Sequence, residues 1–219
     1  MSVKGGGVQT RDGFLFELSG GRLCLDLANT VDDRPADQRK ELLGSYSDLV
    51  AWAEQARVVT SEEAEVLHEE AARRPEEAQG TLAAARRLRE ALFAIFSCVA
   101  NGQSPPEGAL AVLNTALPGA MSALRVAAAG GVFEWRWSLD ERGLDRILSP
   151  VIRDAAELLT SPDLSRVRLC ESESCGWLFL DKSRNRTRRW CDMSVCGNRA
   201  KARRHYERKK RGSEAGGSI

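Results

Sequence analysis

The sequence predicts a mainly helical protein with one small β-hairpin, in which an α-rich body precedes a compact, cysteine-bearing module. Apolar residues recur at helical spacing through most of residues 23–159, while residues 120–139 alternate with a period of two. Four of the six cysteines fall within one basic segment near the C-terminus. The chain of 219 residues is 42% hydrophobic and 29% charged, an ordinary globular composition that excludes wholesale disorder and a collagen-like fold.

The first elements are expected to be short. Residues 1–13 are glycine-rich and polar and predict a loose arm. A brief segment from Phe14 leads to a glycine pair, after which a helix is expected from about Leu23 to Val31. Residues 32–40 predict a polar loop, and apolar residues at helical spacing in 48–55 predict the next helix.

Capping signals delimit the central helices. Thr60 followed three residues later by Glu63 is a capping-box signature, so a helix is expected from there to about Arg74. Pro75 suits the first turn of the following helix, which is expected to extend to Ala100.

Three further elements complete the α-rich part. A helix is expected to open at residues 104–107 and to end at Pro118-Gly119. A hairpin should turn at Gly130-Gly131, and its second strand carries aromatic residues two positions apart: Phe133, Trp135 and Trp137. A last helix over Leu144–Leu159 is expected to be interrupted at Pro150.

Charge divides the chain in the same place as the cysteines do. Residues 165–212 contain 15 Lys/Arg and 5 Asp/Glu, a net charge of +10. Residues 1–164 contain 17 Lys/Arg and 25 Asp/Glu, a net charge of −8. A basic segment joined to an acidic body indicates a polyanion-binding module on a larger scaffold.

The cysteines of this module follow the spacing C-x4-C-x15-C-x4-C: Cys170, Cys175, Cys191 and Cys196. Two close pairs separated by the length of a hairpin are the arrangement that brings four thiolates around a tetrahedral Zn²⁺. Residues 177–180 are strand-like, 183–186 can turn, and 188–190 are expected to return as the second strand. Helix formers from Asn198 to Lys210 place the last ligand at a helix N-terminus, in a treble-clef-like finger.

Physical arguments favour zinc over the alternatives. A module this small has too few large apolar side chains for a core of its own, and bound metal supplies the missing stability. Disulfides or free structural thiols are the other readings, but the chain shows no export signal. A shell of four cysteines leaves no open position for water or substrate, so structural zinc and no enzymatic activity are expected. Cys24 and Cys98 lie in apolar helical stretches and are expected to be buried thiols.

At this point the residues match a known family. Residues 175–210, CGWLFLDKSRNRTRRWCDMSVCGNRAKARRHYERKK, resemble the CGNR zinc finger, which is named for the tetrapeptide found here at 196–199. Residues 20–30, GGRLCLDLANT, resemble the opening of the ABATE domain that usually precedes this finger. The resemblance covers nearly the whole chain and implies a stress-induced bacterial transcription regulator that binds DNA.

The basic residues of the finger favour nucleic acid independently of that resemblance, because arginine suits bidentate contact with phosphate or guanine. The candidates lie between the cysteine pairs and along the last helix: Arg184, Arg186, Arg188, Arg189, Arg199, Lys201, Arg203, Arg204 and Arg208. Arg189 and Arg199, each beside a ligand, could equally well offset the negative charge of a tetrathiolate zinc. Trp177, Phe179 and Trp190 are expected to fill the small core rather than to stack on bases.

Two polar residues interrupt the apolar stretch LCLDLANTV. Asp26 and Asn29 lie three residues apart and therefore on one helix face. The favoured interpretation is a hydrogen-bond network that fixes the start of the domain, because an unpaired buried carboxylate is expensive. The alternative is a small effector pocket anchored by Asp26 and Asn29, with Arg22 nearby.

Together these features predict a zinc-dependent, DNA-binding transcriptional regulator. A domain over residues 14–162 would sense an effector or form a homodimer, and a zinc finger over 165–211 would contact DNA. The alternatives are an RNA- or ribosome-binding zinc protein and a zinc-stapled protein-interaction module. The longest apolar run, residues 91–100, is about half of what a membrane helix needs. We therefore expect no membrane partner and a cytoplasmic location.

Overall fold

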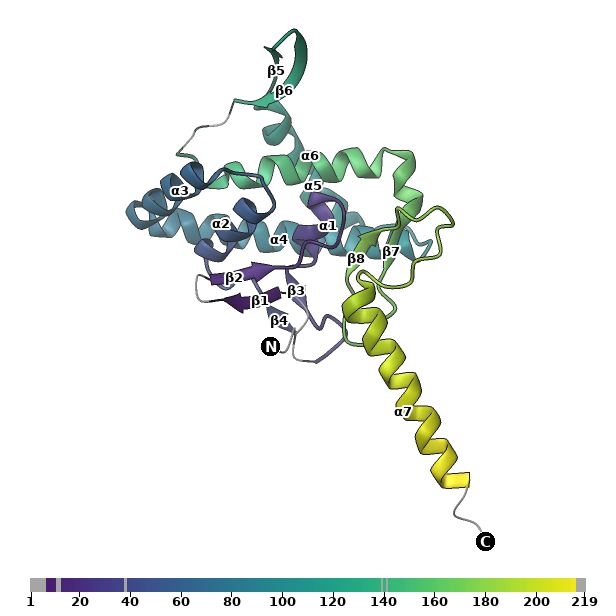
Figure 1. The fold of residues 1–219 in the computed structure, drawn as a ribbon. Coiled ribbons are helices and arrows are strands. Elements are labelled where there is room, and N and C mark those ends of the chain that lie inside the picture. Colours follow the sequence, from purple (N-terminus) through teal and green to yellow (C-terminus); the bar gives the residue numbers. More distant parts are fainter. Residues whose placement is uncertain (1–6, 11–12, 38, 139, 141, 216–219) are drawn as a thin grey trace.

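The computed structural model describes residues 7–10, 13–37, 39–138, 140 and 142–215. Within these ranges the protein is mainly helical, with four antiparallel sheets of two strands each (Figure 1). The predicted fold class is therefore confirmed. No helix in the described part of the chain combines the length and the apolar character that crossing a membrane requires.

The N-terminal region is more ordered than predicted. Strands β1 (Gly7–Thr10) and β2 (Gly13–Phe16) pair as a hairpin, so the expected loose arm is wrong for these residues. The rest of that arm, residues 1–6 and 11–12, lies outside the described residues. The β2 strand is held to the body because the Gln55 side chain accepts from the Phe16 amide at 2.7 Å and donates to the Phe14 carbonyl at 2.9 Å.

Helix α1 (Leu23–Ala28) is shorter than the predicted Leu23–Val31. It ends at Asn29, and the next residues form strand β3 (Val31–Asp32), which pairs with β4 (Lys40–Glu41) across the predicted polar loop. A buried arginine of this loop holds it against the body. Arg34 is only 5% exposed, donates to the Ala28 carbonyl at 2.8 Å and stacks over the Phe93 ring.

Capping boxes begin two of the central helices. The predicted box of Thr60 and Glu63 precedes α3 (Ser61–Arg73), and a second box, formed by Ser45 and Asp48, precedes α2 (Tyr46–Gln55). Helix α4 spans Pro75–Ala100, with the proline in its first turn as predicted.

Two prolines act differently from the prediction. Helix α5 (Glu107–Ser122) continues through Pro118 instead of ending there. Pro118 has no amide hydrogen, so the Asn114 carbonyl has no helical donor. Both residues are exposed, and water can donate to that carbonyl instead. The 3₁₀ turn η1 (Leu144–Ile147) leads directly into α6 (Leu148–Leu159), and Pro150 lies in the tolerant first turn of α6 without breaking it.

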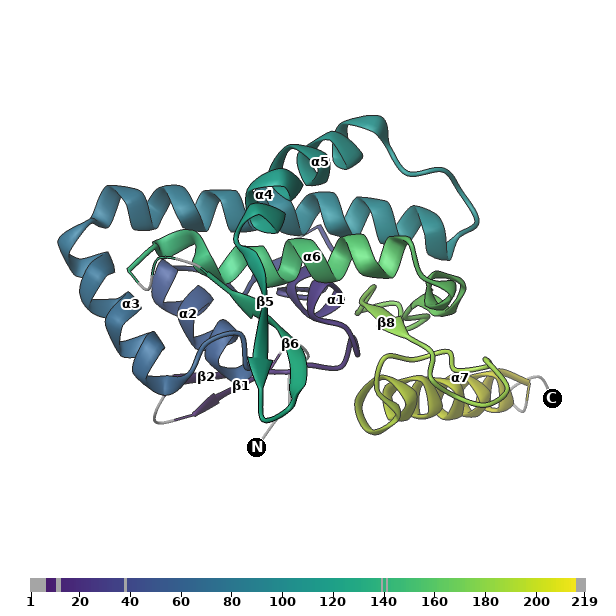
Figure 2. The same ribbon diagram turned by 90° about the horizontal axis from the view of Figure 1, so that it is seen from above.

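Helix α1 lies at the centre of the body. Cys24, Leu25, Leu27 and Ala28 have no exposed surface, and α1 packs against both α4 and α6. Helix α5 covers α4 and α6 from the side that Figure 2 shows at the top. The predicted hairpin is confirmed as β5 (Leu124–Ala129) and β6 (Val132–Trp137), which projects from this bundle (Figures 1 and 2).

The C-terminal module shares its core with the body. After η2 (Pro162–Arg166), strands β7 (Val167–Leu169) and β8 (Leu178–Leu180) pair and lie against α1 and α4. One continuous cluster of buried residues runs from the helices of the body to the four cysteines. The domain boundary between residues 162 and 165 stays a prediction, since the hydrophobic core crosses it.

The Asn29 side chain pairs with the backbone of β8 as a neighbouring strand would, at the contact between the body and the C-terminal module. Its Nδ2 donates to the Leu178 carbonyl at 2.8 Å, and its Oδ1 accepts from the Leu178 amide at 2.9 Å. Close by, the Trp177 indole donates to the Val31 carbonyl at 2.9 Å, and the Leu180 amide donates to the Gly20 carbonyl at 2.8 Å. These bonds fix β8, and with it the cysteine-bearing module, on the body.

Replacing Asn29 should therefore weaken the whole protein. In Asn29→Ala, the Leu178 amide and carbonyl stay buried without partners, and we expect a loss of about 2–4 kcal/mol in the free energy of unfolding. Urea unfolding followed by circular dichroism measures this loss. Asn114→Ala, at an exposed position of α5, is the control and should change stability by less than about 0.5 kcal/mol. Equal effects of the two substitutions would contradict the role given to Asn29.

Candidate metal centre and nucleic-acid interface

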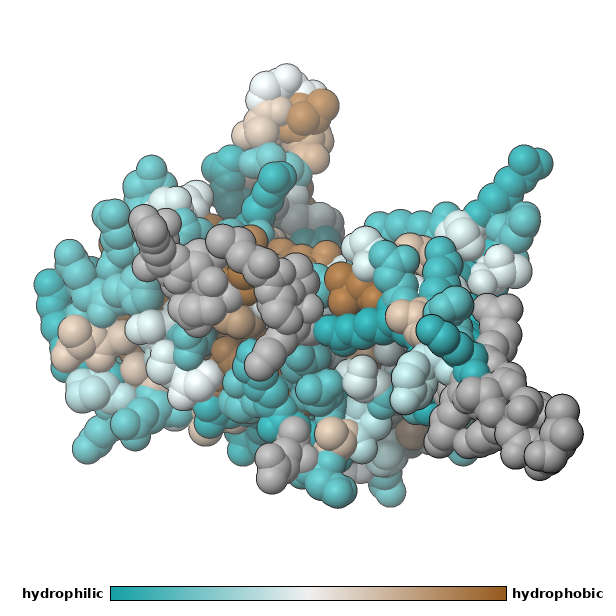
Figure 3. All heavy atoms as spheres, turned by 60° about the horizontal axis from the view of Figure 1, so that its bottom comes forward, coloured by the Kyte–Doolittle hydropathy of each residue, from teal (hydrophilic) through white to brown (hydrophobic). Residues whose placement is uncertain are grey.

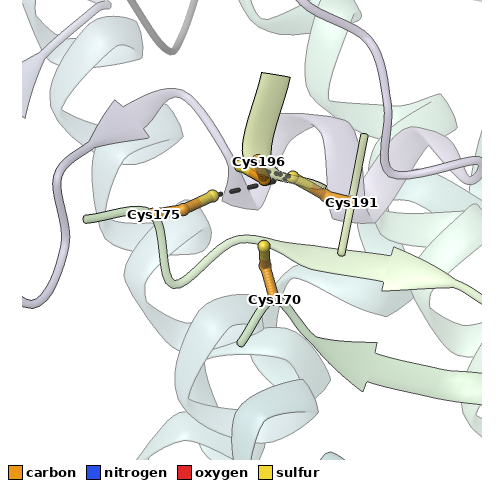
Figure 4. Close-up of side chains that lie close together, drawn as sticks. All are labelled: Cys170, Cys175, Cys191 and Cys196. Atoms are coloured by element: carbon orange, nitrogen blue, oxygen red, sulfur yellow. Dashed lines mark hydrogen bonds between the residues drawn. The ribbon is translucent and has the colours of Figure 1, made fainter. Parts of the chain in front are cut away.

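Four cysteine side chains converge at one point of the C-terminal module (Figure 4). Their sulfurs all lie within 4.8 Å of one another, and all four residues are buried: Cys170, Cys175, Cys191 and Cys196. The Cys175–Cys191 and Cys191–Cys196 sulfur distances are 3.6 and 3.7 Å. Tetrahedral Zn²⁺ with bonds of about 2.3 Å would place its sulfurs about 3.8 Å apart. The residues therefore fit zinc, and a closed four-sulfur shell is typical of a structural site.

The first cysteine pair lies on the tight loop between β7 and β8. The Cys170 amide donates to the Trp177 carbonyl at 2.7 Å, and the Cys175 amide donates to the Ser172 carbonyl at 3.0 Å, which turns both side chains inward. Gly176 follows with φ of +69°, where a side chain would be strained. A Cβ there would also come within 3.2 Å of Pro35 in the loop of the body.

The second pair precedes the last helix. Asp192 caps the π-helical turn η3 (Met193–Gly197) by accepting from the Val195 amide at 2.8 Å. Cys196 lies in this turn, and α7 (Asn198–Ala215) begins directly after it. The prediction that the last ligand lies at a helix N-terminus is thus confirmed in outline.

The predicted return strand over residues 188–190 is wrong. Strand β8 pairs with β7, which precedes the first cysteine, and leaves residues 188–190 as irregular chain. The Arg188 guanidinium fixes this segment instead. It donates to the carbonyls of Trp190 and Cys191 and lies 4.8 Å from the centre of the Phe179 ring. Arg188, a nucleic-acid candidate from the sequence, is thus engaged in holding the second cysteine pair.

The thiols of the cluster differ in pKa. Hydrogen bonds from the other three cysteines lower the pKa of Cys170, whereas the hydrogen bond with Cys170 and burial raise the pKa of Cys175 and of Cys191. Arg199 lines a narrow gap beside three of the sulfurs, opposite the carboxylates of Glu17 and Asp32 on the body. Cys24 is fully buried, and burial raises its pKa well above the ordinary value, whereas Cys98 is half-buried. Both lie outside the cluster, but the prediction of a buried thiol is confirmed only for Cys24 and is wrong for Cys98.

Comparison with protein families accounts for both parts of the chain. A family model named ABATE, with the description "putative stress-induced transcription regulator", matches residues 21–162. The chain belongs to the ABATE family. The model of the CGNR zinc finger matches residues 166–209, a range that includes all four clustered cysteines. A search of curated proteins finds no relative that matches. The cysteine cluster of this ABATE protein is a structural zinc site.

The loop between the cysteine pairs presents two of the predicted arginines to solvent. Arg184 and Arg186 are both exposed, and Arg186 has φ of +52°. The loop is held by Asp181, a residue that the sequence analysis missed, which accepts from the amides of Ser183 and Arg188. Burial raises the pKa of Asp181, but these hydrogen bonds outweigh burial and lower it overall. An aspartate directly after a strand and two residues before a serine is the available signal for this turn.

Helix α7 carries most of the other candidates. Lys201, Arg203 and Arg204 are exposed on its surface, and Arg199 is half-buried at its start. The side chain of Arg208 lies outside the described residues. The helix extends away from the body beyond the finger (Figure 1).

Two glutamates of the first cysteine loop, also missed in the sequence, pair with these cations. Glu171 accepts from Arg189 at 2.5 Å, and Glu173 accepts from Arg203. The four residues border a hollow of about 470 Å³ between the loop and α7, which Trp190 also lines. Trp190 is half-buried and stacks with Arg189 at 5.3 Å, whereas Trp177 and Phe179 are buried as core residues, as predicted.

The three residues of the predicted effector pocket do not lie together: Arg22 and Asp26 line one hollow, and Asn29 lies outside it. Asn29 is directed at Leu178 with both polar groups engaged. Arg22 and Asp26 line an open hollow of about 320 Å³ with Gln55 and Arg57. Arg22 pairs with Asp154 of α6 at 2.8 Å, and Asp26 accepts from the Gly20 amide at 2.8 Å. Burial raises the pKa of Asp26 to about 7, although the Gly20 amide opposes the shift.

Removing one sulfur ligand should release the metal. We expect one zinc per chain in the purified protein and a stoichiometry near zero in Cys191→Ser. Because metal binding contributes directly to folding, the Tm of this variant should fall by about 10 °C. Elemental analysis and thermal unfolding measure both quantities. Cys98→Ser, outside the cluster, should keep its zinc and serves as the matched control. A zinc-free wild type would contradict the site.

The raised pKa of Asp26 makes stability depend on pH. Between about pH 4 and pH 7 the folded protein retains a proton that the unfolded chain releases, so stability falls as pH rises through this window. Asp26→Asn removes this dependence. Relative to wild type, it should gain about 3 kcal/mol in unfolding free energy between pH 4 and pH 8.

Urea unfolding of both proteins at several pH values measures that difference. The titration of all other groups is common to the two proteins and cancels when their unfolding free energies are subtracted. A difference between the two proteins that stays constant from pH 4 to pH 8 would contradict the raised pKa of Asp26.

Proposed function

We propose that this protein is a zinc-dependent, DNA-binding transcriptional regulator in which α7 and the loop around Arg184 and Arg186 contact the DNA. The observation that carries the proposal is the projecting basic helix whose first turn adjoins the zinc ligands. A metal-fixed base gives α7 a defined direction, and the residues from 165 to 212 carry a net charge of +10.

The dimensions of α7 support entry into a major groove. Eighteen residues give a helix of about 27 Å, and the groove is about 12 Å wide, which admits one helix. Lys201, Arg203 and Arg204 lie on the exposed part of α7, where they can reach phosphates or base edges. Arg189 and Arg199 are nearer to the zinc and are the better candidates for offsetting its negative shell.

The glutamates of the first cysteine loop would tune this contact. Glu171 and Glu173 already pair with Arg189 and Arg203, so a DNA phosphate must replace a carboxylate at each arginine. Exposed ion pairs of this kind contribute little stability, and exchange of their partner is inexpensive. The glutamates would then weaken non-specific binding more than specific binding, because only a well-fitted site offers phosphates that replace both carboxylates.

The N-terminal part would control the finger, either by forming a homodimer or by sensing an effector. The open hollow at Arg22 and Asp26 is a site of suitable size for a small effector, and the junction at Asn29 connects α1 to the finger. The proposal includes no enzymatic activity, because a four-sulfur shell offers no free coordination position. A regulator of this kind would act on the chromosome, in the cytoplasm.

The first test is binding to duplex DNA as a function of salt. The zinc-loaded full chain should bind with an affinity that falls steeply as salt rises, because phosphate contacts release counterions. Arg203→Ala combined with Arg204→Ala should weaken binding about tenfold and reduce the salt slope by about 2, without loss of zinc. Fluorescence anisotropy measures both.

Arg73→Ala with Arg142→Ala provides a control of equal charge at exposed positions of the body, away from the finger, and should leave binding unchanged. Salt-independent binding, or equal loss in both double variants, would contradict the role of α7. Competition between duplex DNA and structured RNA tests the alternative nucleic acid, which the half-buried Trp190 in its basic hollow would favour.

A further inference from the structure

The β5–β6 hairpin has one wholly apolar face. In its register each residue of β5 lies opposite one of β6, and opposite residues point to the same side of the sheet. One face therefore carries six apolar side chains: Leu124, Val126, Ala128, Phe133, Trp135 and Trp137. The other face carries Arg125, Glu134 and Arg136 among smaller residues. This pattern is typical of a hairpin that packs one side against a core.

The body covers only the base of that face. Leu124 is 9% exposed and Trp137 is half-buried, whereas Val126 is 60%, Trp135 58% and Phe133 80% exposed. The only ring contact of this face within the described residues is Arg153 of α6, 5.3 Å from the Trp135 ring. Figure 3 shows apolar side chains at the tip of the hairpin, away from the rest of the surface.

A hairpin so placed has little to stabilise it in an isolated chain. It is a sheet of two strands, and such a unit is marginal in water without a hydrophobic covering. Large exposed aromatic side chains grouped on one face mark an interaction site in a protein that stays soluble. Val132, on the opposite face near the turn, is also exposed, but its face is polar further along.

The same protein offers a concave apolar surface that its own hairpin does not reach. A hollow of about 420 Å³ lies between α4, α5 and α6 and is lined mainly by aliphatic side chains, among them Leu88, Ala111, Val112 and Ile152. Arg87 stands at its edge. In Figure 2 the hairpin begins at the C-terminal end of α5, crosses α6 and extends away from the side on which α5 lies, and none of its residues lines this hollow.

We infer that the hairpin is a dimerisation arm: its apolar face covers the α4–α5–α6 hollow of a second copy of this chain, and the second copy returns the same contact. The two surfaces complement each other. Aromatic rings on a convex arm meet an aliphatic hollow, and the arginine at its rim can stack on Phe133 or Trp135 as Arg153 already does.

The area required for a stable dimer favours this exchange over contact between two arms alone. A standard interface buries about 800 Å² on each partner, and one fully buried aromatic side chain contributes about 150–250 Å². Two exposed aromatics cannot supply that area by themselves. Two reciprocal arm-in-hollow contacts use the arm and the hollow of each copy once and close a twofold assembly.

The arm is tested by a pair of variants of the full chain. Wild type should elute with twice the monomer mass of 24.0 kDa, measured by light scattering over a range of concentrations. Phe133→Arg should raise the dissociation constant of the dimer about 30-fold or more. Val132→Arg makes the same change one residue away on the other face and should leave the dimer intact. A monomeric wild type, or equal loss in both variants, would overturn the inference.

The hollow is tested in the same way. Ala111→Arg, at an exposed position on its rim, should also dissociate the dimer, whereas Ala83→Arg, exposed on α4 outside the lining residues, should not. Mixing the Phe133→Arg and Ala111→Arg proteins should give a heterodimer that is weaker than the wild-type dimer but stronger than either variant homodimer, because one intact arm then meets one intact hollow. A dimer that survives Ala111→Arg would overturn the arm-in-hollow contact.

This inference deepens only the dimerisation part of the proposed function, and the two can fail separately. A wild type that is monomeric yet binds duplex DNA would overturn the arm and leave the role of α7 standing. A dimer that depends on Phe133 but binds no DNA at low salt would support the arm and overturn the DNA-binding proposal.

Discussion

The need for four cysteine sulfurs to meet within 4.8 Å governs the C-terminal part of the protein. Strands β7 and β8 have three residues each, and the segment that follows β8 has no regular structure until η3. Hydrogen bonds of such short strands cannot hold a loop and a helix in place. Zinc joins the loop that precedes β8 to the turn that precedes α7, and so it does the work that a hydrophobic core does in a larger domain. The direction of α7 follows from that bond.

The zinc site is also part of the body. Trp177, between the second cysteine and β8, donates to Val31, while Asn29 supplies a strand-like pair of bonds to Leu178. A finger cut free at the predicted boundary would leave these groups unpaired and expose the face of β8. Helix α1 carries Asp26 at the open hollow and is followed by Asn29, which is bonded to Leu178 of β8, so α1 directly connects the proposed effector site with the finger.

The features that the sequence predicts well are those encoded locally. The Thr60–Glu63 capping box, the Pro75 helix start and the glycine turn of the β5–β6 hairpin depend on neighbouring residues, and the cysteine spacing by itself indicates a shared metal. The errors concern what surrounds a segment rather than its own residues. Residues 188–190 resemble a return strand, but β8 is already paired with β7, and Pro118 is tolerated because its surroundings are open to water. The engagement of Asn29 with Leu178 could not be read from spacing, because the two lie 149 residues apart.

Contacts made by the apolar hairpin and by the basic helix are expected to depend on salt concentration in opposite ways. The residues from 1 to 164 carry a net charge of −8, so two bodies that approach each other repel, and salt screens that repulsion. Contact between aromatic and aliphatic side chains does not weaken with salt. Binding of a basic helix to a polyanion weakens as salt rises, because each released counterion gains less entropy in a more concentrated solution. The proposed dimer and the proposed binding of α7 to DNA would thus respond to ionic strength in opposite directions, the first favoured at high salt and the second at low salt.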